Sequence, residues 1–269
     1  MATRKSVKPT ADKAKPPAVR RSAEQARSHI LNIAITEFAA KGFSGARIDA
    51  IAKSAQTNIR MLYHYFGSKE NLYVAVLETV IAELRQEELK LDFSDVEPLA
   101  GLMQMFDFID RHFSEHHELM SILSSENLDR AQYIKKSSLI PTVSSPVLTL
   151  LDSLLKRGVA AGSVAPGIDP LHLYVTLVAM AYYHKSNAHT LSYIFKRDLT
   201  EEKWQAEHRA QTDRMLLCFL RSGSDYAQIA MPADRRGVLP GASSPAVGKR
   251  PARPVAAKVS VAKRQRASK

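Results

Sequence analysis

The sequence holds very little cysteine, since Cys218 is the single thiol in 269 residues. One thiol cannot form an intramolecular disulfide, and no C-x-x-C pair is present to begin a zinc motif. Long apolar runs are also absent: the best one spans only residues 173–183, whereas a membrane helix needs about 20 apolar residues. The N-terminal stretch MATRKSVKPTADKAK contains no apolar core of signal-peptide length. We therefore expect a cytoplasmic chain without disulfides and without a membrane partner.

Sequence signatures of catalysis are missing as well. The chain has no G-x-S-x-G nucleophile elbow, no H-E-x-x-H metalloprotease motif and no glycine-rich phosphate loop. We predict that the protein is not an enzyme, has no catalytic residue and uses no cofactor.

The net charge of +11 is concentrated at the two ends of the chain. Residues 1–22 carry seven basic and one acidic side chain, and residues 222–269 carry ten and two, whereas residues 23–221 carry 21 and 24. Both ends are rich in Ala, Pro, Ser and Lys/Arg and poor in large apolar residues, which predicts disordered basic tails. Such tails either add sequence-independent contacts to DNA phosphates or remain solvated ends.

The middle of the chain has the pattern of an all-α protein, because apolar residues recur at spacings of three and four without sustained alternation. Ser22 is the expected N-cap of the first helix and Gly42 its C-terminal breaker. Prolines 98, 141, 146, 166 and 170 supply most of the later boundaries. The predicted helices span residues 23–41, 47–55, 58–66, 69–91, 96–112, 115–129, 143–161, 170–195 and 200–220.

Three helices of decreasing length at the start of this region describe a helix-turn-helix unit. The third helix is too short to be stable alone, so Leu62 and Phe66 must pack it against the first two. The opposite surface then carries Arg60, Met61, Tyr63 and His64. Arg can bind a guanine edge with two hydrogen bonds, Met and Tyr can contact a thymine methyl group, and His can donate to phosphate. The pattern favours an interaction with double-stranded DNA.

Lys69 occupies the first turn of the fourth helix, which begins after the expected N-cap Ser68. A cation at this end opposes the helix dipole and costs a few tenths of a kcal/mol. A DNA phosphate bound by the free N–H groups and Lys69 would offset that cost. The alternative is a solvated lysine whose effect the neighbouring Glu70 cancels.

The stretch ARIDAIAKSAQTNIRMLYHYFGSKENLY resembles the DNA-binding signature of the TetR family of bacterial regulators, and residues 62–70 match it nearly letter for letter. The resemblance implies that residues 23–69 form the helix-turn-helix domain and residues 70–221 a helical effector-binding and dimerisation domain. It also implies that Arg60, Met61 and Tyr63 enter the major groove. Contacts with the phosphate backbone would come from Arg47, Asn58, His64, Tyr65 and Lys69.

One position departs from the family pattern, because the turn before the third helix usually contains Gly and here reads Ala55-Gln56-Thr57-Asn58. If Gln56 keeps the left-handed backbone conformation, it costs on the order of 1 kcal/mol. Asn58 retains a capping side chain, so we expect the third helix to begin at its usual place.

The C-terminal region resembles RutR-like members of the family more diffusely. The resemblance implies a homodimer built from the last two long helices, with Tyr183, Met215, Leu216 and Phe219 in the interface; each could equally fill the core of one chain. It also implies an unidentified small-molecule effector. Cavities in helical bundles are mostly apolar with few polar groups, so packing and cavity lining cannot be separated by composition. The candidate pocket residues are Met103, Phe106, His112, Tyr174, Val178 and Tyr182.

Histidines 112, 116 and 117 cluster in the sequence, and the first two have the spacing of metal ligands on one helix face. No cysteine or arranged carboxylate set completes a site in the sequence. We therefore predict no metal, and favour helix capping or a polar wall of the effector pocket for these side chains.

The sequence thus predicts a homodimeric TetR-type repressor that binds a palindromic operator and is released by its effector. The alternative is a nucleoid-associated protein whose basic tails bind DNA with little sequence specificity.

Overall fold

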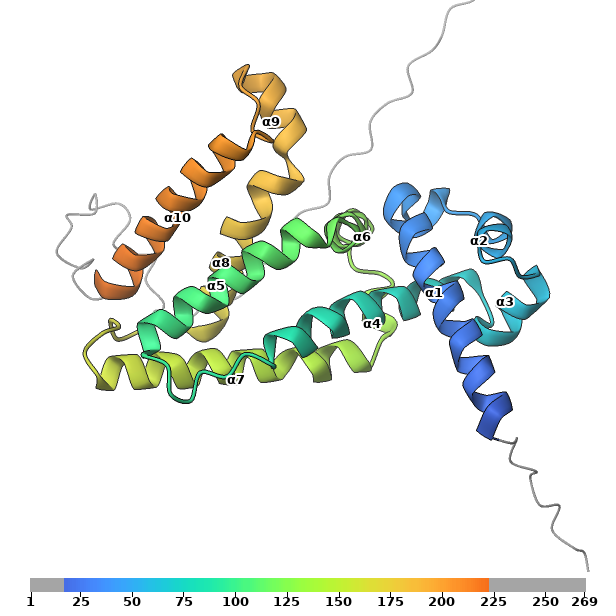
Figure 1. The fold of residues 1–269 in the computed structure, drawn as a ribbon, viewed down its shortest axis with the longest axis horizontal. Helices are drawn as coiled ribbons and strands as arrows, with labels where there is room; N and C mark the ends of the chain where they lie inside the picture. The colour runs from blue at the N-terminus through green and yellow to red at the C-terminus, as the bar shows by residue number, and fades with distance from the viewer. Residues whose placement is uncertain (1–16, 223–269) are drawn as a thin grey trace, which may run out of the picture. The chain divides into compact units, whose positions relative to one another are not determined.

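The computed structural model describes residues 17–222, and every regular element in that range is helical, as predicted (Figure 1). Residues 1–16 and 223–269, which include most of both predicted basic tails, lie outside the described range. A short 3₁₀ turn, η1 (Ile134–Lys136), precedes α7. The helices in chain order are α1 (Pro17–Gly45), α2 (Ile48–Ser54), α3 (Ile59–Phe66), α4 (Lys69–Glu88), α5 (Pro98–Glu115), α6 (His117–Leu128), α7 (Leu139–Ala160), α8 (Pro170–Ser186), α9 (Ala188–Phe195) and α10 (Glu202–Ser222).

Helix α1 begins earlier than predicted. It starts at Pro17, inside the segment expected to be a disordered tail, so Ser22 is not its N-cap. Proline suits the first position of a helix, and the Ala- and Arg-containing sequence that follows has good helix propensity. At the other end Gly42, with a φ of 64° and a ψ of 179°, interrupts the helical backbone as the sequence predicted, and a further helical stretch follows this kink to Gly45.

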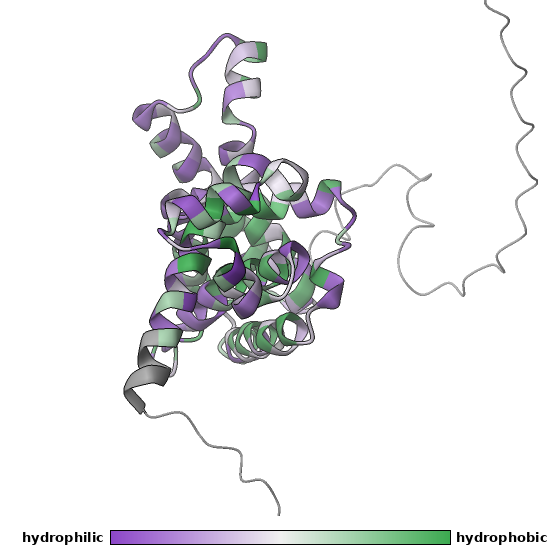
Figure 2. Cartoon of the chain, turned by 90° about the vertical axis from the view of Figure 1, so that its right-hand side faces the viewer, coloured by the Kyte–Doolittle hydropathy of each residue, from purple (hydrophilic) through white to green (hydrophobic). Residues whose placement is uncertain are grey.

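The first three helices share an apolar centre. It is formed by buried side chains of α1 (Ile30, Ala34 and Phe38), α2 (Ile51 and Ala52) and α3 (Leu62 and Phe66). Figure 2 shows hydrophobic segments gathered where helices face one another and hydrophilic segments on their outward sides.

The turn between α2 and α3 confirms the strained conformation predicted for Gln56, whose φ is 50°. The Thr57 N–H donates to the Ala52 carbonyl at 2.9 Å, and the Gln56 N–H donates to the Lys53 carbonyl at 3.1 Å. This pair of bonds is the Schellman arrangement, in which glycine normally occupies the left-handed position. Gln56 therefore closes α2 in the usual way with an unfavourable residue.

Helix α4 joins the three-helix unit to the rest of the fold, because it packs against α1 and α3 near one end and against α7 and α5 further along. Helix α5 in turn packs on α7 and α8, and α6 packs on α1. The Arg157 side chain holds the connection between α4 and α5 by donating to the carbonyls of Phe93 at 2.7 Å and Val96 at 2.8 Å.

Two predicted boundaries in the C-terminal half are wrong. Helix α7 begins at Leu139 and passes through Pro141 and Pro146, because the Ser137 hydroxyl accepts the Leu139 N–H at 3.1 Å and Pro141 sits in the tolerant first turn. Pro146 lies inside the helix with an exposed side chain. Pro98 and Pro170, in contrast, do mark helix starts.

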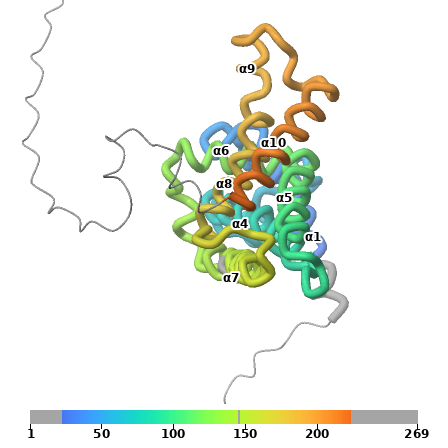
Figure 3. The backbone as a smooth tube through the Cα atoms, turned by 90° about the vertical axis from the view of Figure 1, so that its left-hand side faces the viewer, coloured from blue at the N-terminus to red at the C-terminus, as the bar shows by residue number. Residues whose placement is uncertain are grey.

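The helix predicted over residues 170–195 is two helices. It breaks at Asn187, which ends α8 and precedes α9, although residues 171–195 contain no Pro or Gly. Helix α10 then runs back and packs on α5 (Figure 3).

Candidate functional site

Helix α3 is held at both ends by side-chain and backbone caps. The Asn58 side-chain oxygen accepts the Met61 N–H at 2.8 Å, as expected for the N-cap, and Gly67 ends the helix with a φ of 76°. Leu62 and Phe66 are buried, so the face of α3 that carries them packs against the core. The short helix therefore has a fixed position and a fixed rotation about its axis.

The outer face of α3 presents the side chains that the sequence pattern placed there. Arg60 and His64 are exposed, and Met61 and Tyr63 remain 37% and 44% exposed although they are large and apolar in part. Ile59, which sequence reasoning missed, is 42% exposed on the same helix. Tyr65 is half-buried and packs against the core. Protruding apolar groups beside a guanidinium suit a surface that fits into a DNA groove.

The predicted phosphate-contacting residues lie on or beside this helix, and the two permanent cations among them, Arg47 and Lys69, have partners inside the chain. Arg47 is exposed, and its Nε and Nη2 donate to the two Asp49 carboxylate oxygens at 3.1 and 2.8 Å, which lowers the pKa of Asp49. The Lys69 ammonium lies over the Phe43 ring, 4.8 Å from its centroid, a contact that partly offsets its unfavourable position in α4. Glu70 pairs with Lys136 at 2.6 Å. Glu70 also stays in the first turn of α4, where its carboxylate is favourable, so both explanations of Lys69 stay predictions.

A further cation lies near α3 without having been identified from the sequence. The Arg27 guanidinium of α1 is 4.9 Å from the centroid of the Phe66 ring, and the side chain is exposed. A signal for it was present, since Arg27 precedes the buried Ile30 and Leu31 by three and four positions and so shares their side of α1. Helix periodicity alone, however, does not place it beside α3.

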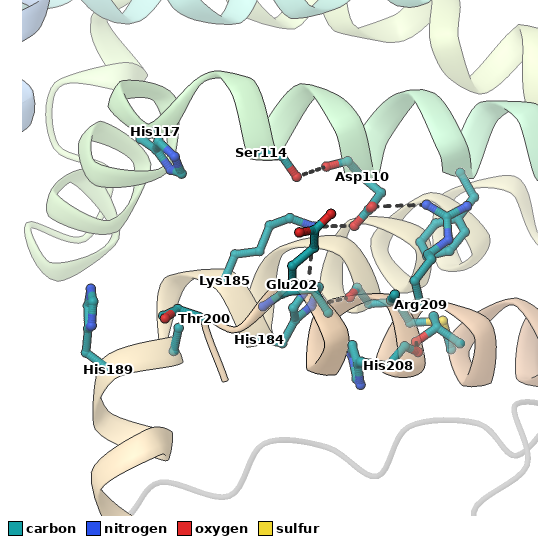
Figure 4. Close-up of a pocket in the computed structure, with 16 residues that line it drawn as sticks. Asp110, Ser114, His117, His184, Lys185, His189, Thr200, Glu202, His208 and Arg209 are labelled. Atoms are coloured by element: carbon teal, nitrogen blue, oxygen red, sulfur yellow. Dashed lines mark hydrogen bonds and ion pairs between the residues drawn. The ribbon is translucent and has the colours of Figure 1, made fainter. Parts of the chain in front are cut away.

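A cavity of about 590 Å³ lies in the C-terminal half, between α5, the end of α8, α9 and α10 (Figure 4). Its wall carries an ion-pair network in which Arg209 binds Asp110 at 3.0 Å and Asp213 at 2.8 Å. Asp110 also pairs with Lys185, and Arg209 also pairs with Asp107. Sequence reasoning missed this polar lining, because its members come from three helices.

Histidines form the other part of this wall. The His208 ring stacks on Trp204, with centroids 4.8 Å apart, and lies 4.5 Å from the His184 ring. Burial, with the nearby charge of Lys185 in a smaller part, lowers the pKa of His184 to about 4. Both rings are therefore predominantly neutral at pH 7, since the pKa of His208 is lowered as well.

Of the predicted pocket residues, Phe106 lines this cavity. Met103 and Val178 pack against the core. Tyr174 and Tyr182 are half-buried and hydrogen-bonded, and His112 is buried with its Nδ1 3.2 Å from a Glu87 oxygen. The six predicted pocket residues therefore do not surround this cavity together, since Phe106 is the one member that lines it.

Tyr174 belongs to a buried charged cluster that links α4 to α8. Its hydroxyl accepts from Arg85 and is 3.2 Å from a Glu88 oxygen, while Arg85 also pairs with Glu88. Burial raises the pKa of the fully buried Glu88 to about 7, against the opposing effect of Arg85. The burial of Glu88 could have been predicted from the sequence, because positions 77, 81, 84 and 88 form one helical stripe that is apolar except for this glutamate.

The residues predicted for a dimer interface divide into two groups. Tyr183, Met215 and Phe219 are 60%, 62% and 45% exposed. Leu216 is fully buried, because it is turned about 100° around α10 from the exposed Met215 and packs into the core of the chain. Its assignment to an interface is therefore wrong. Leu171 and Val175 of α8, missed earlier, are also more than half exposed.

Histidines 112 and 116 lie with ring centroids 4.1 Å apart, whereas His117 lines the large cavity (Figure 4). His116 joins α5 to α6 without a capping hydrogen bond from its side chain, so the capping role is wrong for this residue. Among residues 17–222, no helix combines the length and apolarity needed to cross a membrane.

Comparison with known proteins agrees with this geometry. Residues 30–76 match the family model described as bacterial regulatory proteins, tetR family, and residues 98–216 match the tetracyclin repressor-like C-terminal domain. The chain is 34% identical to the transcriptional repressor NicS of Pseudomonas putida over 69% of its own length and 87% of NicS. It is 26% identical to the regulator RutR of Escherichia coli over 68% of its length and 84% of RutR.

Solved structures show the same fold at low sequence identity. One is the fatty acid degradation regulator FadR of Bacillus halodurans, with a TM-score of 0.53 and 20% identity over 76% of this chain and 97% of FadR. Another is a TetR regulator of Chloroflexus aurantiacus, with a TM-score of 0.53 and 16% identity over 74% of this chain and 96% of that one.

Proposed function

The chain belongs to the TetR family of transcriptional regulators, and on that basis we propose that it represses transcription by binding a palindromic operator as a homodimer. A small-molecule effector releases it from the operator. The proposed role is non-catalytic and is exerted on DNA in the bacterial cytoplasm.

The observation that carries this proposal is the outer face of α3. A capped helix of eight residues, whose inner face is fixed by Leu62 and Phe66, presents Arg60, Met61 and Tyr63 outward. In a major groove Arg60 would bind a guanine edge, and the two other side chains would contact thymine methyl groups or the sugar. In a two-fold dimer the two recognition helices would lie about 34 Å apart, one duplex turn.

Backbone phosphates would be held by the residues around α3. Asn58 uses its side-chain oxygen for the cap, so its amide NH₂ stays available as a donor. Lys69 and the first N–H groups of α4 would bind one phosphate, and His64 and Tyr65 another. Arg47 would exchange part of its contact with Asp49 for a phosphate.

The dimer would form through the exposed apolar side chains of α8 and α10. Tyr183, Met215 and Phe219, with Leu171 and Val175, leave a large apolar area in water in the single chain. Its burial is favourable by roughly 25 cal/mol per Å². Apolar patches of this kind, formed by two helices, support a four-helix interface between two copies.

The effector would enter the C-terminal domain and favour a geometry in which the two recognition helices have the wrong separation. The cavity bounded by Phe106, Asp110, Lys185 and Arg209 supports a small polar effector, because charged groups surround an apolar floor. The buried cluster of Arg85, Glu88 and Tyr174 would carry the change to α4. Met103, His112, Val178 and Tyr182 remain proposed pocket residues that become accessible in the effector-bound state.

The proposal is tested by selecting bound fragments from genomic DNA and footprinting the enriched site. We expect a discrete protected palindrome. The Arg60→Ala variant should lose about 1–3 kcal/mol of the binding free energy that separates the preferred base from other bases at the contacted position. Arg111→Ala removes the same charge from an exposed site on α5, so this control should bind the operator like the wild type. Uniform protection with no effect of Arg60→Ala would contradict the proposal and would favour the nucleoid-associated alternative.

A further inference from the structure

Two pairs of potential metal ligands meet where α4 crosses the end of α5. Glu83 and Glu87 are one helical turn apart on α4, and His112 and His116 are one turn apart on α5. We propose that Glu87, His112 and His116 bind a divalent transition-metal ion of the Zn²⁺ class. One ligand atom from each of these three side chains lies within 4.8 Å of the others.

The distances suit a tetrahedral ion after small side-chain rotations. Zinc bonds to His nitrogen and carboxylate oxygen are about 2.0–2.2 Å long, so tetrahedral ligand atoms are roughly 3.3–3.5 Å apart. His112 Nδ1 is already 3.2 Å from Glu87 Oε2, and the two His rings are 4.1 Å apart between centroids. Two imidazoles and one carboxylate are also a ligand set that favours Zn²⁺ over Mg²⁺ or Ca²⁺.

Space for an ion is present beside His112 and His116. A recess of about 70 Å³ is lined by Glu83, His112 and His116, and Glu118 stands at the same wall. Its apolar sides are Ile35 of α1, Val80 of α4 and Leu119 of α6. A volume of roughly 15 Å³ is enough for one water. The recess can therefore hold an ion together with a water or the Glu83 carboxylate as the fourth ligand.

The arrangement is hard to explain by packing alone. His112 is 4% exposed, and its Nδ1 faces a Glu87 carboxylate oxygen at 3.2 Å. The His116 ring lies beside it, 4.1 Å from the His112 ring between centroids. The carboxylates that the histidines lacked in sequence are supplied by α4, 25 positions away.

The site would tie together the elements that surround it. An ion bound here crosslinks α4 to α5 at a point closed by α1 and α6. Since these helices include both α1 of the three-helix unit and α4, metal binding should raise the free energy of unfolding of the whole described fold.

The experiment uses the full-length chain after removal of metal with EDTA. Zn²⁺ binding is measured by calorimetry, and Co²⁺ is added separately to record the absorption bands of tetrahedral coordination. The variants are His116→Gln and Glu87→Gln, neither of which removes a fully buried side chain. His117→Gln is the matched control, because His117 is the next residue and lines the other cavity (Figure 4).

We expect one Zn²⁺ per wild-type chain with a Kd below about 1 µM. Each ligand variant should weaken binding by more than about tenfold, since even outer-shell partners of a metal typically contribute that much. His117→Gln should bind like the wild type. The proposal is overturned if wild-type binding is weaker, if either ligand variant stays within tenfold of the wild type, or if the control loses affinity equally. Circular dichroism of all variants in EDTA verifies that each is folded.

Discussion

Replacing Gln56→Gly should stabilise the protein, because Gln56 holds the left-handed position that closes α2. An L-residue with a Cβ in this conformation costs roughly 1–2 kcal/mol. Glycine removes that cost but adds about 0.5–1 kcal/mol of chain entropy to the unfolded state. The expected net gain is therefore about 0.5–1 kcal/mol, and the backbone hydrogen bonds of the turn are unchanged.

The measurement is thermal unfolding at fixed protein concentration, since dimerisation would make Tm concentration-dependent. For about 200 folded residues, 1 kcal/mol corresponds to roughly 2–4 °C, so Tm should rise by about 1–4 °C. Gln56→Ala keeps the Cβ and should change Tm little. Gly67→Ala, at a φ of 76° with Asn71 Nδ2 only 3.3 Å from the new Cβ, should lower it. A Gln56→Gly variant no more stable than Gln56→Ala would refute the assignment of strain to this turn.

Two further predictions concern the C-terminal domain. The pKa of Glu88 is raised from 4.5 to about 7, so its contribution to stability is present below pH 4.5 and is lost as the pH rises through about 7. His184, whose pKa is lowered to about 4, acts in the opposite direction, because its contribution to stability is lost as the pH falls below 6.5. Removing the Glu88 carboxyl should therefore give Glu88→Gln a more positive slope of the unfolding free energy against pH between 5 and 7 than the wild type has. Denaturant unfolding measures this slope, and an unchanged slope would contradict the assignment. Phe219→Asp should shift the sedimentation coefficient from dimer to monomer, whereas Ala210→Asp, exposed on the opposite side of α10, should not; a dimeric Phe219→Asp chain would place the interface elsewhere.

Local chemistry explains why the DNA-reading unit could be predicted closely. The caps Asn58 and Ser68, and the turn at Gly67, depend on side chains and backbone within four residues of one another. The bounds of α3 follow from these signals and from the pair Leu62 and Phe66 at helical spacing. The same local rule failed at Pro146, because one face of α7, with Val147, Leu151 and Leu154, is buried against neighbouring helices and this packing outweighs one lost hydrogen bond.

The candidate sites of the C-terminal half could not be predicted in the same way. The contact between Tyr174 and Glu88 joins residues 86 positions apart, and that between Arg209 and Asp107 joins residues 102 apart. Periodicity identifies a buried face but not the helix it meets. It therefore could not decide between core and interface for Leu216, or supply Glu87 to the histidines of α5.

Helix α4 is long enough to turn a small tilt at one end into a large displacement at the other. Its 20 residues make it about 30 Å long, with Lys69 at the end beside the three-helix unit and the Arg85–Glu88 cluster at the other. If α4 pivots at the cluster, a tilt of about 5° displaces the end near α3 by roughly 2.6 Å, almost the length of a hydrogen bond. A rearrangement too small to disturb the packing around Tyr174 would thus be amplified at Arg60, and the contact with a base that we propose for this side chain would be lost.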